Sequence, residues 1–162
     1  FHANGGSFHI GALEIFPYTV PHDAAEPCQY VFQSRRQRLG ILTDAGTVTA
    51  HMLAHLQGLD ALLLEFNHDR EMLAQGPYPY FLQRRVGGSH GHLSNCQAAR
   101  LLQRLAHQQW KFLIGAHVSE KNNAEPLVRS AVHAVDASLG ERLCLLDQNQ
   151  PSGWFDLDAG EP

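Results

Sequence analysis

"ALLLEFNHD", residues 61–69, joins an apolar run of strand length to a polar end. Because the run shows no polar alternation, it predicts a strand buried on both faces, as in a sheet with helices packed against it. The polar residues at its end are Glu65, Asn67, His68 and Asp69. In sheets of this kind ligands bind beyond the carboxyl ends of the strands. The stretch therefore predicts an α/β fold with functional side chains at one edge of the sheet.

Three further apolar strands are predicted to end in the same way, at His22 and Asp23, at Asp44 and at His117. Each residue alone has an ordinary explanation, since His22 could lie in a loop, Asp44 could form a turn and His117 could cap the next loop. Four strands that each deliver an acid or an imidazole to one edge are harder to explain in that way. Imidazole nitrogen and carboxylate oxygen together suit zinc, manganese or iron rather than calcium.

A second stretch, "GGSHGHLSNCQAARLLQRLAH" (residues 87–107), places histidines and glycines directly before a predicted helix. Ser94 and Gln97 form a capping-box pattern, so the helix is expected to begin near Asn95. The amino end of a helix carries a partial positive charge that favours an anion such as phosphate. His92 is placed where it could donate a proton to that anion, although this segment alone fits a tight loop shaped by Gly91 and His92 better.

The rest of the chain is strand-rich at first and alternates between strand and helix later. Two strands interrupted near Gly11 are expected first, and then a hairpin of residues 29–34 and 38–43. The later elements are helices over 48–58, 70–74, 80–86 and 124–139 and strands over 111–116 and 142–147. This order predicts one α/β (α+β) domain over residues 1–162, with a loosely packed tail over residues 148–162.

The composition limits the class of protein. The chain has 162 residues, of which 44% are hydrophobic and 17% are charged, as is typical of a globular domain with a substantial core. A net charge of −4 argues against a protein that coats nucleic acid through a basic surface. Histidine is frequent, with 11 residues against 12 lysines and arginines together, which favours a metal site or an acid–base site.

The cysteines indicate a reducing compartment. Cys28, Cys96 and Cys144 are isolated and form no C-x-x-C pair, so neither a disulfide framework nor a zinc knuckle is indicated. We therefore expect a cytoplasmic protein. The longest apolar stretches are too short to span a bilayer, so no membrane partner is expected.

Five stretches occur in a fixed order along the chain: "VPHDA" (20–24), "LGILTDAG" (39–46), "LLLEFNHDREMLAQGPYP" (62–79), "GGSHGHLSN" (87–95) and "IGAHVSEKNN" (114–123). With these stretches the chain resembles the metallo-β-lactamase-fold hydrolases over about residues 8 to 146. The resemblance is strongest to the YycJ/WalJ-like branch, which is related to ribonuclease Z and to the phosphodiesterase PhnP. It implies an αββα sandwich with a two-metal site at one edge.

The resemblance also implies roles for single residues. In that family the residues matching His22 and His117 each bind one metal ion, and the residue matching Asp44 bridges both. His92 resembles the proton donor of the phosphodiesterase members, so His92 and Asp44 are the expected catalytic residues. The implied cofactors are two divalent metal ions, zinc or manganese, with iron as a further option. The other residues expected to line the site are His68, Asp69, Asp23 and Ser94.

The function implied by the resemblance is metal-dependent hydrolysis of phosphodiesters, with nucleic acid as the substrate and exonuclease as the most concrete activity. Two alternatives stay open at this point. One is a phosphodiesterase that acts on small molecules. The other is a non-catalytic or metal-free module of the same fold that serves in binding or assembly.

The first signature of the family, His-x-His-x-Asp-His, does not occur in the sequence. Three ligands shared between two ions leave each ion with two protein contacts, whereas catalytic zinc sites have three. We therefore expect the chain to form the C-terminal part of the fold. An N-terminal half in the same polypeptide is expected to supply the absent ligands and to pack against residues 8–20 and 29–43.

Overall fold

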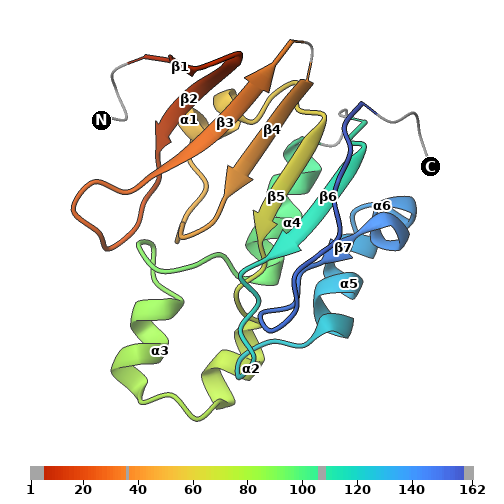
Figure 1. The fold of residues 1–162 in the computed structure, drawn as a ribbon. Helices are drawn as coiled ribbons and strands as arrows, with labels where there is room; N and C mark the ends of the chain where they lie inside the picture. The colour runs from red at the N-terminus through yellow and green to blue at the C-terminus, as the bar shows by residue number, and fades with distance from the viewer. Residues whose placement is uncertain (1–5, 36, 106–108, 159–162) are drawn as a thin grey trace.

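The computed structural model describes residues 6–35, 37–105 and 109–158, which form a seven-stranded sheet with helices packed against it (Figure 1). Arg36 in the predicted hairpin turn and His107 at the end of the predicted capped helix lie outside these residues, as do residues 159–162 of the tail. The strands lie in the sheet in chain order, from β1 to β7. The predicted α/β class is confirmed.

The sheet has an antiparallel part and a parallel part. Its antiparallel strands are β1 (Phe8–Ile10), β2 (Leu13–Thr19), β3 (Cys28–Ser34) and β4 (Gln37–Leu42). The strands that continue parallel to β4 are β5 (Ala61–Glu65), β6 (Phe112–Ala116) and β7 (Cys144–Leu145). Because β3 runs opposite to both β2 and β4, the carboxyl ends of β2, β4, β5 and β6 reach the same edge of the sheet.

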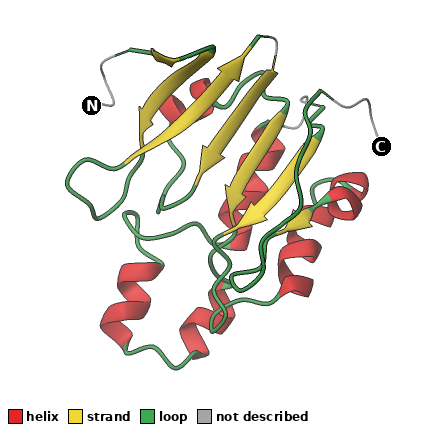
Figure 2. Ribbon diagram, in the orientation of Figure 1, coloured by secondary structure: helices red, strands yellow, loops and turns green. Residues whose placement is uncertain are grey.

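Helices cover one face of the sheet, and two more follow the carboxyl end of β5 (Figure 2). The covering helices are α1 (Ala50–His55), α4 (Asn95–Arg104), α5 (Glu125–His133) and α6 (Ala137–Arg142). The other two are α2 (Arg70–Gln75) and α3 (Tyr80–Val86). None of the helices in the described part of the chain is long and apolar enough to cross a lipid bilayer.

The capping box predicted for α4 is present. The Ser94 hydroxyl donates to Oε1 of Gln97 at 2.6 Å, and the Ser94 backbone N–H donates to the same oxygen at 3.0 Å. The helix begins at Asn95, as the sequence predicted. Its apolar side then packs into the core through residues such as Leu101 and Leu102, which are at most 1% exposed.

The core lies between the helices and one face of the sheet. Leu42, Leu62 and Leu64 point to this face and are completely buried, together with Met52 of α1. Full burial of a leucine or methionine side chain contributes about 1.5–3 kcal/mol. Leu63 points to the opposite face of β5 and is only partly buried, so the predicted burial on both faces is wrong at this position.

We call this second face of the sheet the open face. Its partly buried apolar side chains come from neighbouring strands and include Phe32, Leu39, Ile41, Leu63 and Phe112. The described part of the tail has no helix or strand and crosses this face. The Phe155 ring contacts that of Phe112 edge-on, with 5.3 Å between centroids, whereas Trp154 is fully exposed. The tail therefore covers the open face in part.

Two elements near the end of the chain differ from the prediction. The helix expected over residues 124–139 is divided into α5 and α6, because the Asp136 carboxylate accepts bonds from backbone N–H groups in the first turn of α6. Gly140 lets α6 approach α5, since a Cβ there would lie 2.9 Å from the Cα of His133. The strand expected over residues 142–147 is reduced to β7, since α6 includes Arg142 and only Cys144 and Leu145 pair with β6.

Candidate metal centre

The loops after β2, β4, β6 and the segment before α4 meet at one edge of the sheet, with Asp44 at the centre. Asp44 Oδ1 lies 3.8 Å from His22 Nε2, 3.7 Å from His117 Nδ1 and 3.6 Å from His92 Nδ1. Residues far apart in the sequence are thus brought together where the strand-end pattern placed them. Their roles as metal ligands or proton donors stay a prediction.

The orientation of His22 is fixed by the backbone. Its Nδ1 lies 3.0 Å from the carbonyl oxygen of Gly91, and a carbonyl oxygen only accepts hydrogen bonds. The proton therefore resides on Nδ1, and the lone pair of Nε2 faces Asp44. Metal-binding histidines are commonly held in this way, with the second ring nitrogen donating to a backbone carbonyl or a carboxylate.

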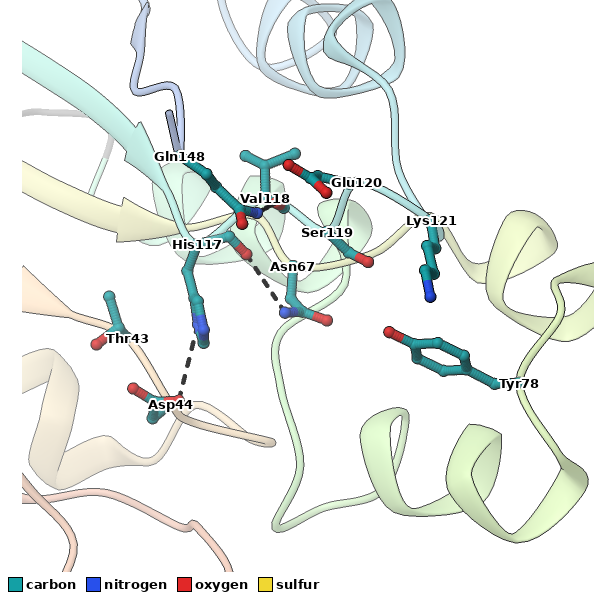
Figure 3. Close-up of a pocket in the computed structure, with 10 residues that line it drawn as sticks. All are labelled: Thr43, Asp44, Asn67, Tyr78, His117, Val118, Ser119, Glu120, Lys121 and Gln148. Atoms are coloured by element: carbon teal, nitrogen blue, oxygen red, sulfur yellow. Dashed lines mark hydrogen bonds and ion pairs between the residues drawn. The ribbon is translucent and has the colours of Figure 1, made fainter. Parts of the chain in front are cut away.

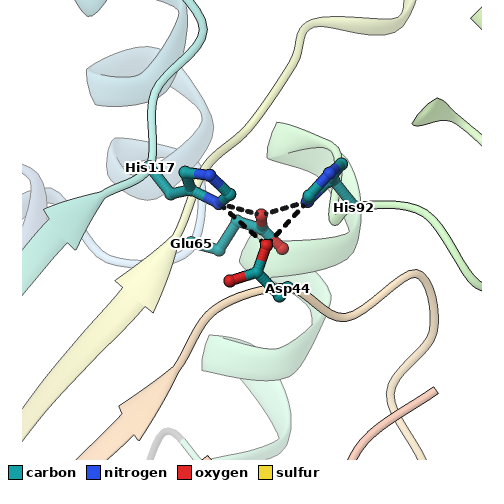
Figure 4. Close-up of side chains that lie close together, drawn as sticks. All are labelled: Asp44, Glu65, His92 and His117. Carbon is teal, nitrogen blue, oxygen red and sulfur yellow. Dashed lines mark hydrogen bonds and ion pairs between the residues drawn. The ribbon is translucent and has the colours of Figure 1, made fainter. Parts of the chain in front are cut away.

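Glu65, at the end of β5, was not among the residues expected to bind metal, to act in catalysis or to line the site. Its side chain is completely buried. Oε1 accepts hydrogen bonds from Nδ1 of His92 at 2.8 Å and Nδ1 of His117 at 2.7 Å (Figure 4). Oε2 accepts from the backbone N–H groups of Leu93 at 3.0 Å and Ala45 at 3.3 Å. A carboxylate has about four lone-pair directions, so these donors occupy all of them.

Glu65 is therefore ionised and sets the tautomers of two histidines. Burial alone would raise the pKa of Glu65, but hydrogen bonds from His117 and His92 and from a backbone N–H group lower it to about 2. An ionised carboxylate cannot donate, so both rings donate from Nδ1 and keep Nε2 free. The hydrogen bond to Glu65 also raises the pKa of His117, against the opposing effect of burial.

One signal in the sequence could have identified Glu65. It is an acid within the apolar run of residues 61–66, and a buried carboxylate needs hydrogen-bond donors or a cation. The sequence does not say which donors these are. They come from the loop after β4, the segment before α4 and the end of β6.

Two of the three predicted ligands have an unusual backbone conformation. Asp44 has a φ of 53° and His117 a φ of 55°, in the left-handed region that favours glycine. Within the described residues, the only other non-glycine residue with positive φ is Arg35, in the β3–β4 turn. Such conformations cost about 1–3 kcal/mol and occur mainly where the surrounding structure imposes them, often at functional sites.

Glycines allow the loops around the site to pack backbone against backbone. A Cβ on Gly46 would lie 2.4 Å from the carbonyl oxygen of Gly88. A Cβ on Gly91 would lie 2.2 Å from the carbonyl oxygens of both Arg85 and Val86. Because real Cβ atoms do not approach this closely, both positions require glycine for close loop packing.

The anion site expected at the amino end of α4 is wrong. The backbone N–H groups of Leu93, Ser94 and Asn95 already donate to oxygen atoms of the protein, at 2.9 to 3.0 Å. These donors are therefore not free to bind a phosphate. The predicted capping pattern is confirmed, but the acceptors for the N–H groups of Leu93 and Asn95 are Glu65 of β5 and the carbonyl oxygen of His68 in the loop after it.

Three of the four residues expected to line the site serve the surrounding fold instead. The Ser94 hydroxyl is buried in the capping box, and the Asp69 carboxylate caps α2 by accepting from two backbone N–H groups at 3.0 Å. The His68 ring is 3% exposed, and its Nδ1 lies 3.3 Å from Oδ1 of Asn67. Burial lowers the pKa of His68 to about 4, so the ring is neutral.

Asp23 does lie beside the cluster. Its Oδ1 is 3.6 Å from Nε2 of His22, and its other oxygen accepts a hydrogen bond from Arg85 of α3. That hydrogen bond lowers the pKa of Asp23. Asp23 therefore links α3 to the loop that carries His22.

Two cavities meet at the cluster, with volumes of about 690 and 350 Å³. Asp44 and His117 line both of them. The larger cavity also contains Asn67, Tyr78 and Lys121 (Figure 3), and the smaller contains His22, Asp23 and His92. An extended ligand could therefore pass over the cluster with a part in each cavity.

The residues at this junction fit a divalent metal ion. Oxygen and nitrogen atoms of Asp44, Glu65, His92 and His117 lie within 4.8 Å of one another. Glu65 and Nδ1 of both rings are already used in the hydrogen bonds described above, so the Asp44 carboxylate is the group of this set that is open to an ion. His22 Nε2 and the Asp44 carboxylate face each other at 3.8 Å, too far for a hydrogen bond, and both are electron-pair donors. A cation between them satisfies both, and the mixture of nitrogen and oxygen suits zinc, manganese or iron.

Comparison with known proteins shows the family to which the chain belongs. The profile of the β-lactamase superfamily domain matches residues 2–115. The exodeoxyribonuclease YycJ of Bacillus anthracis is 37% identical over 126 residues, which cover 78% of this chain and 48% of that protein. The chain thus spans about half the length of the curated relatives it matches.

Solved structures share the fold at low sequence identity. The metallo-β-lactamase fold protein YhfI of Bacillus subtilis has a TM-score of 0.66 and 14% identity, covering 90% of this chain and 51% of that chain. A diphosphatase of the PhnP family has a TM-score of 0.55 and 17% identity, covering 87% of this chain and 43% of that chain. The matches in sequence and in fold establish that the chain belongs to the β-lactamase superfamily and has the metallo-β-lactamase fold.

Proposed function

We propose that the chain carries part of the active site of a metal-dependent hydrolase that cleaves phosphodiester bonds in nucleic acid. The observation that supports this most strongly is the junction at Asp44, where a cation site and a held imidazole lie side by side. His22 and Asp44 present electron pairs to one point, and His92 is anchored next to them by Glu65.

In this proposal His22, Asp44 and His117 hold two divalent metal ions, zinc or manganese, with Asp44 shared between them. Glu65 is not a ligand, because its four lone-pair directions are already used. When bound, such ions supply Lewis-acid chemistry, which activates water and offsets negative charge on the phosphoryl group.

His92 is proposed to act as the general acid. Because Nδ1 of His92 donates to Glu65, Nε2 is the nitrogen that would carry the proton for the leaving group. The side chain is 21% exposed and lines the smaller cavity. With a proton on Nε2, the ring would donate it to the leaving oxygen, while the hydrogen bond to Glu65 holds the ring in place.

A second sheet is proposed to pack on the open face and to supply further metal ligands. Three protein ligands shared by two ions fall short of the three per ion found in catalytic zinc sites. The open face presents partly buried apolar side chains from β3 to β6, including Phe32, Ile41 and Leu63. Large apolar patches of this kind are rarely left exposed on proteins.

Nucleic acid is proposed as the substrate because YycJ is named an exodeoxyribonuclease. The net charge of −4 means that a strand would be held by local groups at the site rather than by the surface as a whole. The cytoplasm is the proposed location, supported by Cys28, Cys96 and Cys144, none of which forms a disulfide.

The test uses the protein at its natural length, with bis(p-nitrophenyl) phosphate and linear DNA as substrates. We expect hydrolysis of both, loss of activity with EDTA, and recovery with zinc or manganese. Hydrolysis of the small ester alone would indicate a small-molecule phosphodiesterase. A folded protein without bound metal and without either activity would support the binding or assembly module and contradict the proposal.

A further inference from the structure

We propose that the larger cavity binds a terminal phosphate of the nucleic-acid strand through Lys121 and Tyr78, so that the enzyme selects phosphorylated strand ends. This inference rests on the proposed function, since it names the part of the substrate that is recognised beside the same cluster. The cavity of about 690 Å³ lies within the range of about 300–1,000 Å³ that is usual for small-ligand sites.

The cavity has a cluster end and a cationic end. Asp44 and His117 lie at the first end, Tyr78 and Lys121 lie at the second, and Asn67 lies between them (Figure 3). In that view the Lys121 ammonium and the Tyr78 hydroxyl point toward each other. A phosphodiester at the cluster would therefore direct the adjoining nucleotide toward two hydrogen-bond donors.

The charge of Lys121 has no counter-charge within the described part of the chain. Neither its ammonium nor the Tyr78 hydroxyl makes a hydrogen bond or ion pair there. The neighbouring acid, Glu120, also lines this cavity, but its carboxylate makes no ion pair with Lys121, and its Oε1 lies 3.5 Å from Nδ2 of Asn149. In the smaller cavity, by contrast, Arg85 is paired with Asp23. The uncompensated positive charge is thus in the larger cavity.

The segment that carries Lys121 is fixed in place on both sides. The backbone N–H of Ser119 donates to the carbonyl oxygen of Asn67 at 2.9 Å. The backbone N–H of Asp69 donates to the carbonyl oxygen of Asn122 at 2.9 Å, and the N–H of Asn122 donates to Oγ of Ser119 at 3.2 Å. A cation on such a segment loses little backbone freedom when a ligand binds.

Tyr78 is presented by an equally stiff corner. It lies between Pro77 and Pro79, whose rings fix their own φ angles and restrict the residue before each. Its carbonyl oxygen accepts a hydrogen bond from Nε2 of Gln83 at 3.0 Å. The backbone that carries the phenol is therefore held in place, and the hydroxyl can donate a second hydrogen bond to the ligand that Lys121 attracts.

An ammonium and a phenolic hydroxyl together fit a phosphate monoester better than a base or a sugar. A terminal phosphate carries about two negative charges and three free oxygens, so it can neutralise Lys121 and accept from both donors. A base or a hydroxyl end in the same place would leave the ammonium without a counter-charge. The two sources of this group, a 5′ and a 3′ phosphate, have the same chemistry and are distinguished below.

The test compares kcat/KM of the metal-loaded protein at its natural length on three forms of one oligodeoxynucleotide, which carry no terminal phosphate, a 5′ phosphate or a 3′ phosphate. We expect one phosphorylated form to be preferred by about 10- to 100-fold, and that form identifies the end that is recognised. In Lys121→Gln the ratio should fall to near 1, and in Tyr78→Phe it should fall by about 2- to 10-fold. Lys111→Gln, which changes the only other lysine of the chain, should keep the ratio.

Binding of thymidine 3′,5′-bisphosphate, measured by calorimetry, gives a readout that does not need turnover. We expect Lys121→Gln to weaken it by about 10- to 100-fold relative to wild type and Lys111→Gln. Equal affinities, or equal end preferences in wild type and Lys121→Gln, would overturn the inference. If no oligonucleotide is hydrolysed, the proposed function fails, and the calorimetry still decides whether the cavity binds the phosphate.

Discussion

Replacing Glu65 by Gln should disable the site by exchanging the tautomers of two histidines. The carboxylate now accepts four hydrogen bonds, two of them from Nδ1 of His92 and His117. An amide of the same size has one acceptor oxygen and one donor group. If its oxygen keeps the two backbone N–H groups, its NH₂ faces both rings, which must then accept at Nδ1 and carry their proton on Nε2.

The effect on function follows from the position of that proton. His117 with a proton on Nε2 loses its free electron pair, and the loss of a partner that orients a metal ligand typically lowers metal affinity by about 10- to 100-fold. His92 would lose the carboxylate that fixes its tautomer and orients its ring. We therefore expect turnover to fall by about 10²- to 10⁴-fold.

The effect on stability is smaller. Two bonds to a charged acceptor become neutral hydrogen bonds, and the two ring contacts are reversed, with a loss of about 1 kcal/mol at each changed bond and about 2–4 kcal/mol in total. For a domain of this size that corresponds to a decrease in Tm of about 5–15 °C. The variant should therefore be folded at 25 °C.

The assay combines thermal unfolding, bound metal and turnover on bis(p-nitrophenyl) phosphate. Glu141→Gln, an exposed position on α6, is the matched control and should behave as wild type. Glu65→Asp keeps the charge and should retain more metal than Glu65→Gln. Wild-type turnover and metal content in a folded Glu65→Gln protein would show that the Glu65 carboxylate does not set the tautomers on which the site depends.

Three further predictions concern single residues. His92→Ala should lower turnover by about 10²- to 10⁴-fold with bound metal unchanged, and loss of metal would instead make His92 a ligand. Gly91→Ala should lower the free energy of unfolding in urea by at least about 2 kcal/mol, because its Cβ would lie 2.2 Å from two carbonyl oxygens. A Cβ at Gly153 would have no atom within 4 Å, so the control Gly153→Ala should change that free energy by less than about 0.5 kcal/mol. Because burial lowers the pKa of His68 to about 4, the unfolded chain binds its proton more readily, so stability should fall by about 2–3 kcal/mol between pH 7 and pH 4.5. His68→Gln should remove that decrease, and an equal decrease in both proteins would contradict it.

The sequence could predict those features that depend on strand direction and local pattern. The polar residues that follow an apolar strand show where the carboxyl end of that strand lies, and the carboxyl ends of parallel strands lie at the same edge of the sheet. His22, Asp44 and His117 could therefore be placed together before the structure was known. The start of α4 was equally accessible, because the capping box between Ser94 and Gln97 is formed by residues three positions apart.

The remaining features depend on contacts between distant segments. Glu65 accepts hydrogen bonds from residues 20 to 52 positions away in the sequence, and its sequence neighbours do not indicate which residues these donors are. The positive φ of Asp44 and His117 is imposed by the surrounding structure, and it cannot be predicted from the residue types aspartate and histidine. The same reason explains the wrong anion site at α4. Its N–H groups look free locally but are used by Glu65 and by the loop that carries His68.

Metal analysis of the purified protein at its natural length decides whether the cluster at Asp44 is a metal site. We expect two divalent ions per chain by plasma mass spectrometry, because Asp44 is proposed to be shared by an ion at His22 and a second ion at His117. Asp44→Asn should then retain less than one ion, while the exposed control Asp147→Asn should retain both. A wild-type protein without stoichiometric metal, or an Asp44→Asn protein with the wild-type metal content, would show that Asp44 does not hold metal.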